Sequence, residues 1–426
     1  MKTINICSGL LLSALLISTN GFSQDQLFAS AEAPPRDGTI TTTEPTAEGE
    51  KKKEEEAKTF TLSGTIDTYF RSSFGTMNPY MGNYGPSTSF ADLKGFGLGM
   101  ANLIASYSGE KAGFTADLVF GPRGQAAVFG TASGQAVINQ MFAYYKLSDK
   151  VTLNLGQFNT FLGYEVISPA VNFHYSTSYL FSWGPFNHTG ARADFDLGGG
   201  LVAKLAVMNP TDIVEFNPVN TYTLGGQLGH TSDKGGIWLN VLYGDQDGKL
   251  DTKDDAYVRD EDGAIVLDED GNPVFISSAG SLFQVDLTTG WNLSEKFYLG
   301  FNTSMQSVAA GESFISEGNL KDASGDASTF TGFAIYPKVT LSESFALGLR
   351  AEYLSVTNGH LGIFGTDADG NGSVTELTLS GNYKVGGLTF IPEFRIDKTS
   401  EDSFVDADGK ATDMMPSLTL AAVYKF

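Results

Sequence analysis

The connections between successive apolar segments of this chain alternate between short and long. From residue 60 onward, about sixteen segments alternate apolar and polar residues at period two, the pattern of a β-strand with one apolar face. The short connections are polar or glycine-rich and lie near residues 108, 147, 198, 232, 293, 341 and 385. A soluble β-sandwich has no reason to sort its loops by side, whereas an outer-membrane barrel has short periplasmic turns and long external loops. The sequence therefore predicts an all-β fold, a transmembrane antiparallel up-and-down β-barrel of about 16 strands.

The last ten residues form such a segment and end on an aromatic residue. One face carries Leu418, Leu420, Ala422, Tyr424 and Phe426. The segment is about as long as a tilted membrane-spanning strand needs to be. Pairing with the first strand would close the sheet and leave no exposed edge. An edge strand of a soluble sandwich is the alternative interpretation of this segment alone.

The composition fits a barrel that a hydropathy plot would miss. Aromatic residues make up 12% of the 426 residues, and 50 residues are glycine. Charged residues make up 18%, which is below the usual quarter of a soluble domain. No interior apolar run is long enough for a membrane-spanning helix. Only every second residue of a barrel strand meets lipid, so the apolar signal of each strand is diluted.

Charge and motif content argue against several classes of function. The net charge of -22 disfavours nucleic acid as a partner. The single cysteine, Cys7, lies in the expected leader, so the mature chain should have no disulfide and no thiolate metal site. The four histidines lack metal-ligand spacing, and the chain contains no nucleophile elbow, His-Glu-x-x-His motif or phosphate-binding loop. We therefore expect a protein that is not an enzyme.

Three regions are predicted along the chain. Residues 1–23 read as a secretory signal peptide, with Lys2, a short apolar core and small residues at the cleavage positions. Residues 24–58 carry three prolines and a run of lysines and glutamates, which predicts a disordered periplasmic linker. A docking role for this linker is the alternative. Residues 59–426 are the predicted barrel, and an even strand count would leave both termini in the periplasm.

Several motifs resemble the type two group of β-barrel porins of Gram-negative outer membranes. The clearest are Leu155-Gly-Gln-Phe-Asn-Thr-Phe-Leu-Gly-Tyr-Glu165, Asn172-Phe-His-Tyr-Ser-Thr-Ser178 and Pro185-Phe-Asn-His-Thr-Gly-Ala-Arg192. The opening strand around 63–69 and the closing strands around 350–353 and 393–397 are also similar to the family. This resemblance covers nearly the whole predicted barrel. It implies a pore-forming outer-membrane protein and does not specify a solute.

Face assignment predicts a polar lumen. The residues on the face opposite the apolar set include about seven cations and eight anions, and a balanced lumen predicts weak ion selectivity. The alternative is that these charges pair across neighbouring strands and only brace the wall. The predicted pore-lining residues are Asp67, Arg71, Asp117, Lys146, Arg192, Asp194, Asp196, Lys204, Asp286, Lys338, Arg350, Glu352, Glu393, Arg395 and Asp397.

The long loop 163–186 is the predicted constriction. It is unusually aromatic for an exposed loop, so we expect it to fold inward or to pack on the wall. Its candidate residues are Glu165, His174, Tyr175, Tyr179 and Trp183, and Glu165 and His174 would face the pore. The aromatic rings could alternatively stack on the faces of sugars, which would make a saccharide path. A further alternative is a loop that packs against its neighbours and fills the rim.

The external loops are acidic, and one has ligand spacing for calcium. Asp367, Asp369, Asn371 and Ser373 match the opening of an EF-hand loop. The closing glutamate of that motif is missing, because Thr378 stands in its place. Asp-Gly sequences also form ordinary turns, which is the leading interpretation, and weak Ca²⁺ binding is the alternative. No other cofactor is expected.

The function predicted from these features is passive diffusion of small hydrophilic solutes through the barrel. The alternatives are a saccharide-selective channel and a closed barrel that serves as a surface adhesin or structural anchor. The expected partners are outer-membrane lipid, small solutes and further copies of the chain in a homo-oligomer.

Overall fold

The computed structural model describes residues 59–77, 88–128, 137–219, 221–246, 264–267, 271, 281–309 and 327–426. The predicted signal peptide and linker, residues 1–58, lie outside the described residues. In the described parts of the chain, no helix is long and apolar enough to cross a bilayer.

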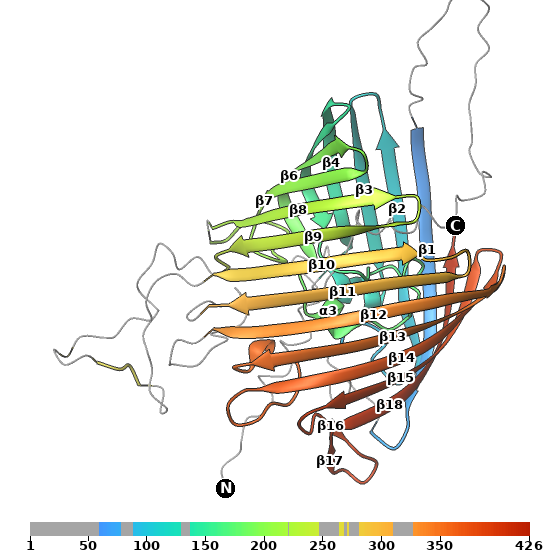
Figure 1. Ribbon diagram of the computed structural model, residues 1–426, viewed down its shortest axis with the longest axis vertical. Helices are drawn as coiled ribbons and strands as arrows, with labels where there is room; N and C mark the ends of the chain where they lie inside the picture. The colour runs from blue at the N-terminus through green and yellow to red at the C-terminus, as the bar shows by residue number, and fades with distance from the viewer. Residues whose placement is uncertain are drawn as a thin grey trace, which may run out of the picture.

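Sixteen antiparallel strands form one closed barrel, as predicted (Figure 1). Each strand pairs with its neighbours in sequence, and β1 pairs with β18 to close the sheet. The barrel strands are β1 (Thr59–Ser73), β2 (Gly95–Ser108), β3 (Ala112–Phe120), β4 (Ile138–Ser148), β5 (Val151–Asn159), β6 (Asn187–Gly198), β7 (Leu201–Met208), β8 (Thr223–Ser232), β9 (Gly235–Gly244), β10 (Leu282–Asn292), β11 (Phe297–Val308), β12 (Ser328–Ser342), β13 (Phe345–Thr357), β14 (Gly372–Val385), β15 (Leu388–Thr399) and β18 (Met414–Lys425).

The predicted sorting of the connections is confirmed. The short turns 109–111, 149–150, 199–200, 233–234, 293–296, 343–344 and 386–387 all lie at one end of the barrel. Thr59 pairs with Ser108, and the Gly64 amide donates to the Phe426 carbonyl at 3.1 Å. The first described residue and Phe426 therefore lie at the short-turn end, and the strand ends that flank the long connections lie at the opposite end.

The burial pattern along each strand is inverted relative to that of a soluble protein. On β14, Leu377 and Leu379 point outward and are 45% and 50% exposed, whereas Glu376, Thr378 and Ser380 point inward and are fully buried. An apolar outer face and a polar inner face are what a lipid-facing barrel requires. Closure pairs the backbone of every strand on both sides, so the wall presents no open edge to the bilayer.

The long loops contain short elements that were not predicted from the sequence. They are α2 (Pro122–Ala127), α3 (Tyr179–Ser182), the 3₁₀ turn η1 (His360–Gly362) and the hairpin β16 (Phe404–Val405) with β17 (Ala411–Thr412). The hairpin meets the β1–β2 connection through a bridge between Thr76 and Asp406. None of these elements is long enough to show a periodic pattern, so periodicity cannot detect them.

Candidate functional site: the barrel interior

Residues 160–186, between β5 and β6, fold into the barrel, and we call this segment the interior loop. The Thr160 amide donates to the Phe186 carbonyl at 3.0 Å and closes the neck of the loop. The predicted aromatic residues are buried, with Tyr175, Tyr179 and Trp183 exposed by 0%, 1% and 7%. An exposed loop could not bury so many rings, and the composition of the segment accounts for its inward path.

Arg350 on β13 is the main link between the wall and the interior loop. Its guanidinium donates to the loop at Glu165 Oε1 and at the Ser176 carbonyl, each at 2.7 Å. It also donates to both carboxylate oxygens of Glu376 on β14, at 2.9 and 3.3 Å. All three charged side chains are almost completely removed from solvent. A bidentate guanidinium–carboxylate pair is strong and fixes orientation.

Three more charged wall residues bind the backbone of the interior loop. Glu352 on β13 accepts from the Tyr179 and Leu180 amides at 2.7 and 2.6 Å. Glu393 on β15 accepts from the Tyr175 and Ser176 amides at 2.8 and 3.1 Å. Arg395, also on β15, donates to the Thr177 carbonyl at 2.7 Å and pairs with Asp397 at 2.7 Å. The charges on β13–β15 thus satisfy backbone groups that would otherwise be buried without partners.

The interior loop also reaches strands away from β13–β15. Asp286 on β10 accepts from the Gly163 amide at 3.0 Å. Asp67 on β1 accepts from the Tyr175 hydroxyl at 2.6 Å. Contacts with β1, β10, β13 and β15 mean that the loop crosses the lumen and does not merely line one wall.

His174 is buried in the loop and contacts Ser380 on β14. Its Nδ1 lies 2.8 Å from Ser380 Oγ, and the Ser380 hydroxyl donates to Glu393 at 2.9 Å. Because that hydroxyl has only one proton, His174 Nδ1–H is the donor to Ser380. Burial, together with the nearby Arg350 guanidinium, lowers the pKa of His174 well below its usual value.

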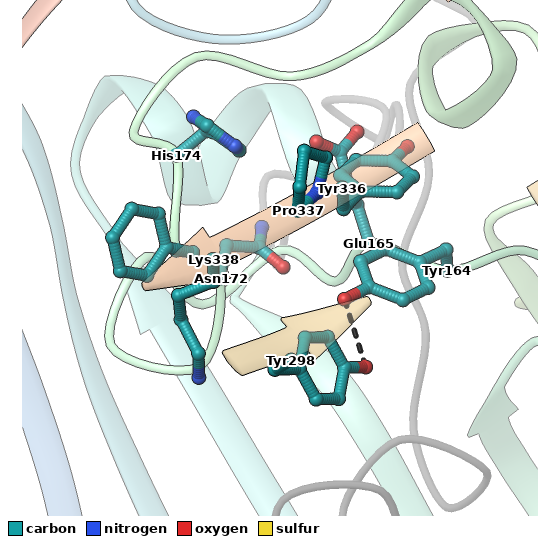
Figure 2. A pocket seen from close by; sticks show the side chains of 9 residues that line it. Tyr164, Glu165, Asn172, His174, Tyr298, Tyr336, Pro337 and Lys338 are labelled. Atoms are coloured by element: carbon teal, nitrogen blue, oxygen red, sulfur yellow. Dashed lines mark hydrogen bonds between the residues drawn. The ribbon is translucent and has the colours of Figure 1, made fainter. Parts of the chain in front are cut away.

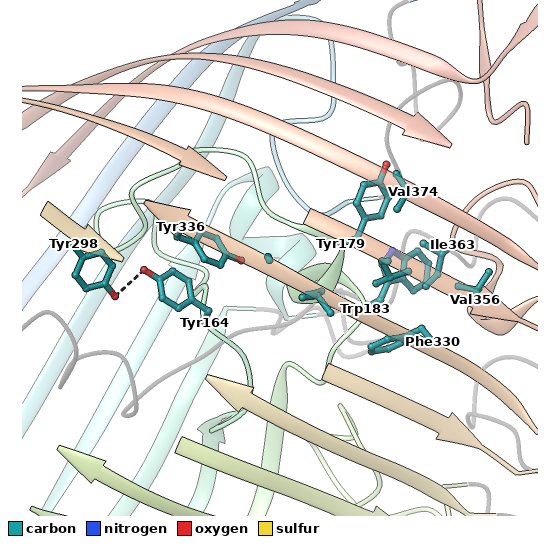
Figure 3. Close-up of a cluster of buried hydrophobic side chains, with 12 residues drawn as sticks. Tyr164, Tyr179, Trp183, Tyr298, Phe330, Tyr336, Val356, Ile363 and Val374 are labelled. Atoms are coloured by element: carbon teal, nitrogen blue, oxygen red, sulfur yellow. Dashed lines mark hydrogen bonds between the residues drawn. The ribbon is translucent and has the colours of Figure 1, made fainter. Parts of the chain in front are cut away.

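The aromatic rings of the loop pack against wall residues in a buried cluster (Figure 3). Tyr164 stacks on Tyr336 with ring centroids 4.0 Å apart and donates to the Tyr298 hydroxyl at 2.9 Å. Beside these residues is a recess of about 20 Å³, which also touches His174 and Lys338 (Figure 2). That volume holds roughly one water. The rings are occupied by protein contacts, so this geometry does not support the alternative of a stacking track for sugars.

A comparison with known families finds that residues 59–426 match the family described as "Putative beta-barrel porin-2, OmpL-like". The match spans the entire described barrel. The chain belongs to this porin family. The resemblance seen in the sequence is confirmed. A comparison with curated proteins finds no match.

Solved structures support the fold of this porin. The outer membrane channel DcaP of Acinetobacter baumannii is 13% identical with a TM-score of 0.55, over 88% of this chain and 99% of that chain. OmpT of Vibrio cholerae in its trimer form is 10% identical with a TM-score of 0.54, over 87% and 100%. An anion-selective porin from Comamonas acidovorans is 11% identical with a TM-score of 0.50, over 87% and 100%. At 10–13% identity these likenesses show the barrel fold, and the family match identifies the chain as an outer-membrane porin.

The structure divides the fifteen predicted pore-lining residues of this porin into two groups. Eleven are buried: Asp67, Arg71, Asp117, Arg192, Lys204, Asp286, Arg350, Glu352, Glu393, Arg395 and Asp397. The other four, Lys146, Asp194, Asp196 and Lys338, are half-buried or exposed. Glu165 and His174 are buried against the wall, which differs from the expectation that they face the pore. The roles of all these residues in permeation stay predictions.

Glu376, which binds Arg350, and Arg123, which binds the loop, were not predicted from the sequence. Glu376 lies on the inner face of β14, and its outward neighbours Leu377 and Leu379 were a signal that could have placed it there. Arg123 on α2 donates to the Ile167 carbonyl at 2.9 Å and lies 4.4 Å from the centre of the Phe90 ring. Nothing in the local sequence pattern indicates the contacts of Arg123, because these contacts form only when the interior loop has folded into the barrel.

The loop of this porin with calcium-ligand spacing, residues 367–373, forms backbone turns. Asp367 Oδ1 accepts from the amides of Asp369 and Asn371 at 3.0 and 2.8 Å. Asp406 repeats this arrangement with Asp408 and Lys410. Among the described residues, no group of three or more His, Cys, Asp or Glu side chains is placed to hold a metal ion. Calcium binding at Asp367–Ser373 stays a prediction, which a calorimetric titration would test.

Proposed function

We propose that this porin lets small hydrophilic solutes diffuse passively through a lumen that the interior loop narrows. The observation that carries this proposal is the attachment of the loop to β1, β10, β13 and β15. A loop held at these strands crosses the lumen and narrows the path of a solute. The short turns and both termini would face the periplasm, and the long loops would face outward.

The charges that remain accessible in the lumen support weak ion selectivity. Lys146 and Lys338 are cationic, and Asp194 and Asp196 are anionic. Asp194 is further balanced by Arg192, whose guanidinium lies 2.8 Å from it. Opposed charges around a pore screen permeating ions without strongly favouring one sign. We therefore expect a reversal potential close to zero in asymmetric potassium chloride.

Replacing residues 161–185 by an Asn-Gly turn is expected to raise single-channel conductance several-fold and to admit larger sugars in liposome swelling. Thr160 and Phe186 already pair across the neck of the loop, and Asn-Gly favours a two-residue hairpin turn. The freed wall charges would be hydrated by the widened lumen. Heat-modifiable gel mobility would show that the variant is folded.

An unchanged conductance in a folded variant would contradict the constriction. A wild-type barrel that is folded but silent in a planar bilayer would favour the adhesin or anchor alternative instead.

We also propose that the barrel is a homo-oligomer in the membrane. The supporting observation is that one similar solved barrel, OmpT of Vibrio cholerae, is described in a trimer form. Chemical cross-linking of the native membrane protein, followed by sizing, would test this, and a band pattern limited to the monomer would contradict it.

A further inference from the structure

Gly300 and Gly348 are among the wall glycines that lie directly against aromatic rings of the interior loop. A Cβ atom on Gly300 of β11 would lie 2.4 Å from the Tyr164 hydroxyl oxygen, and one on Gly348 of β13 would lie 2.3 Å from a ring carbon of Phe173. Both distances are far below a van der Waals contact. Any other residue at either position would push the ring away. We call Gly300 and Gly348 the socket glycines.

Each ring is also held on its other sides. Tyr164 is stacked on Tyr336 and hydrogen-bonded to Tyr298. Phe173 meets the His174 ring edge to face at 5.4 Å, and the Lys338 ammonium lies 5.8 Å from its ring centre. Neither ring can therefore tilt away without losing contacts that position the loop.

We propose that the socket glycines determine the cross-section of the pore, because they fix the depth at which the interior loop sits in the lumen. A loop that moved as a gate would have to withdraw two rings from close-fitting sockets and break the Arg350 contacts in the same step. The interior loop is thus a fixed constriction. This inference rests on the proposed function, because it specifies how that constriction is held.

A double-mutant cycle tests the socket at Gly348 by the stability of the folded barrel. The variants are Gly348→Ala, Phe173→Ala and the combination, compared by the temperature at which heat-modifiable mobility is lost. Gly348→Ala should lower that temperature in the wild-type background and have little effect in the Phe173→Ala background, since the clashing ring is then absent. If Gly348→Ala alone does not fold, Phe173→Ala should restore folding. Additive effects, or no rescue, would overturn the proposal.

Gly226 on β8 supplies the matched control. It lies on the same kind of strand, but a Cβ atom there would have no atom within 4 Å. Gly226→Ala should leave both stability and channel currents unchanged. The Gly300→Ala, Gly348→Ala double variant should show a larger or fluctuating conductance and a larger sugar cut-off. A double variant with the same steady currents as Gly226→Ala would overturn the claim that the sockets set the pore size.

The two proposals fail in different ways. An unchanged conductance after removal of residues 161–185 would contradict the constriction, whereas coupling in the cycle would still show that Gly348 seats the Phe173 ring. A conductance that rises when residues 161–185 are removed would support the constriction. If Gly348 and Phe173 then show no coupling in the double-mutant cycle, the proposal that the socket glycines position the loop is overturned.

Discussion

Replacing Arg350 by methionine is expected to destabilise the folded barrel by about 3–5 kcal/mol, the usual result of removing one partner from a buried ion pair. Methionine has a similar volume, so the change removes charge and hydrogen bonds with little loss of packing. Glu165 would then be left buried without its guanidinium, and Glu376 would keep only the more distant guanidinium of Arg395, at 3.8 Å. Release of the loop would let water reach both carboxylates. We therefore expect a wider pore as well as a less stable barrel.

Denaturant unfolding followed by heat-modifiable mobility would measure the stability, and planar-bilayer recording would measure the conductance. Arg350→Lys should lose less stability, because it keeps the charge but not the bidentate geometry. Lys398→Met is the control, since its pair with Asp413 is largely exposed and such pairs contribute about 0–1 kcal/mol. If Arg350→Met were no more harmful than Lys398→Met, the network would not hold the loop.

Placing arginine at Leu379 is expected to destabilise the barrel in lipid by about 2–4 kcal/mol, the cost of a cation at the bilayer midplane. Leu379 lies midway along β14 on the outer face, and it pairs with Leu349 and Phe394 on the adjacent strands. Lipid surrounds this position on the outer side, so the guanidinium would have neither water nor a carboxylate nearby.

Val385 provides the comparison on the same strand. It points to the same face but lies at the short-turn end, where the cost of a charge falls to about 0–1 kcal/mol. Reversible unfolding in lipid vesicles would give both values. Equal, small effects of Leu379→Arg and Val385→Arg would mean that the outer face of β14 does not meet the bilayer core.

The strands and short turns of this porin were predictable because their signals are local. A period-two pattern needs only a few consecutive residues, and each turn carries its own polar or glycine residues. At the turn 199–200, for example, Gly198, Gly199 and Gly200 all have positive φ, a conformation that glycine adopts at little cost. The inward path of the interior loop was also predictable, because its rings could not remain in water.

The partners of that loop were not predictable, because they depend on closure of the sheet. Arg350 and Glu165 are separated by 185 residues, and Tyr175 and Asp67 by 108. Alternation assigns each wall charge to the inner face, but it does not say which charges face water and which face protein. Lys338 and Glu393 therefore looked alike in the sequence, although Lys338 is half-buried and Glu393 is buried under the loop.

The sequence by itself determined the barrel, its inner and outer faces and the end at which each loop lies, because period-two alternation and turn chemistry act over a few residues. Only the tertiary structure decided that residues 160–186 cross the lumen, that β13–β15 hold them and that Gly300 and Gly348 receive their rings. Those contacts join segments more than a hundred residues apart, and they come together only after sixteen strands have closed into a wall.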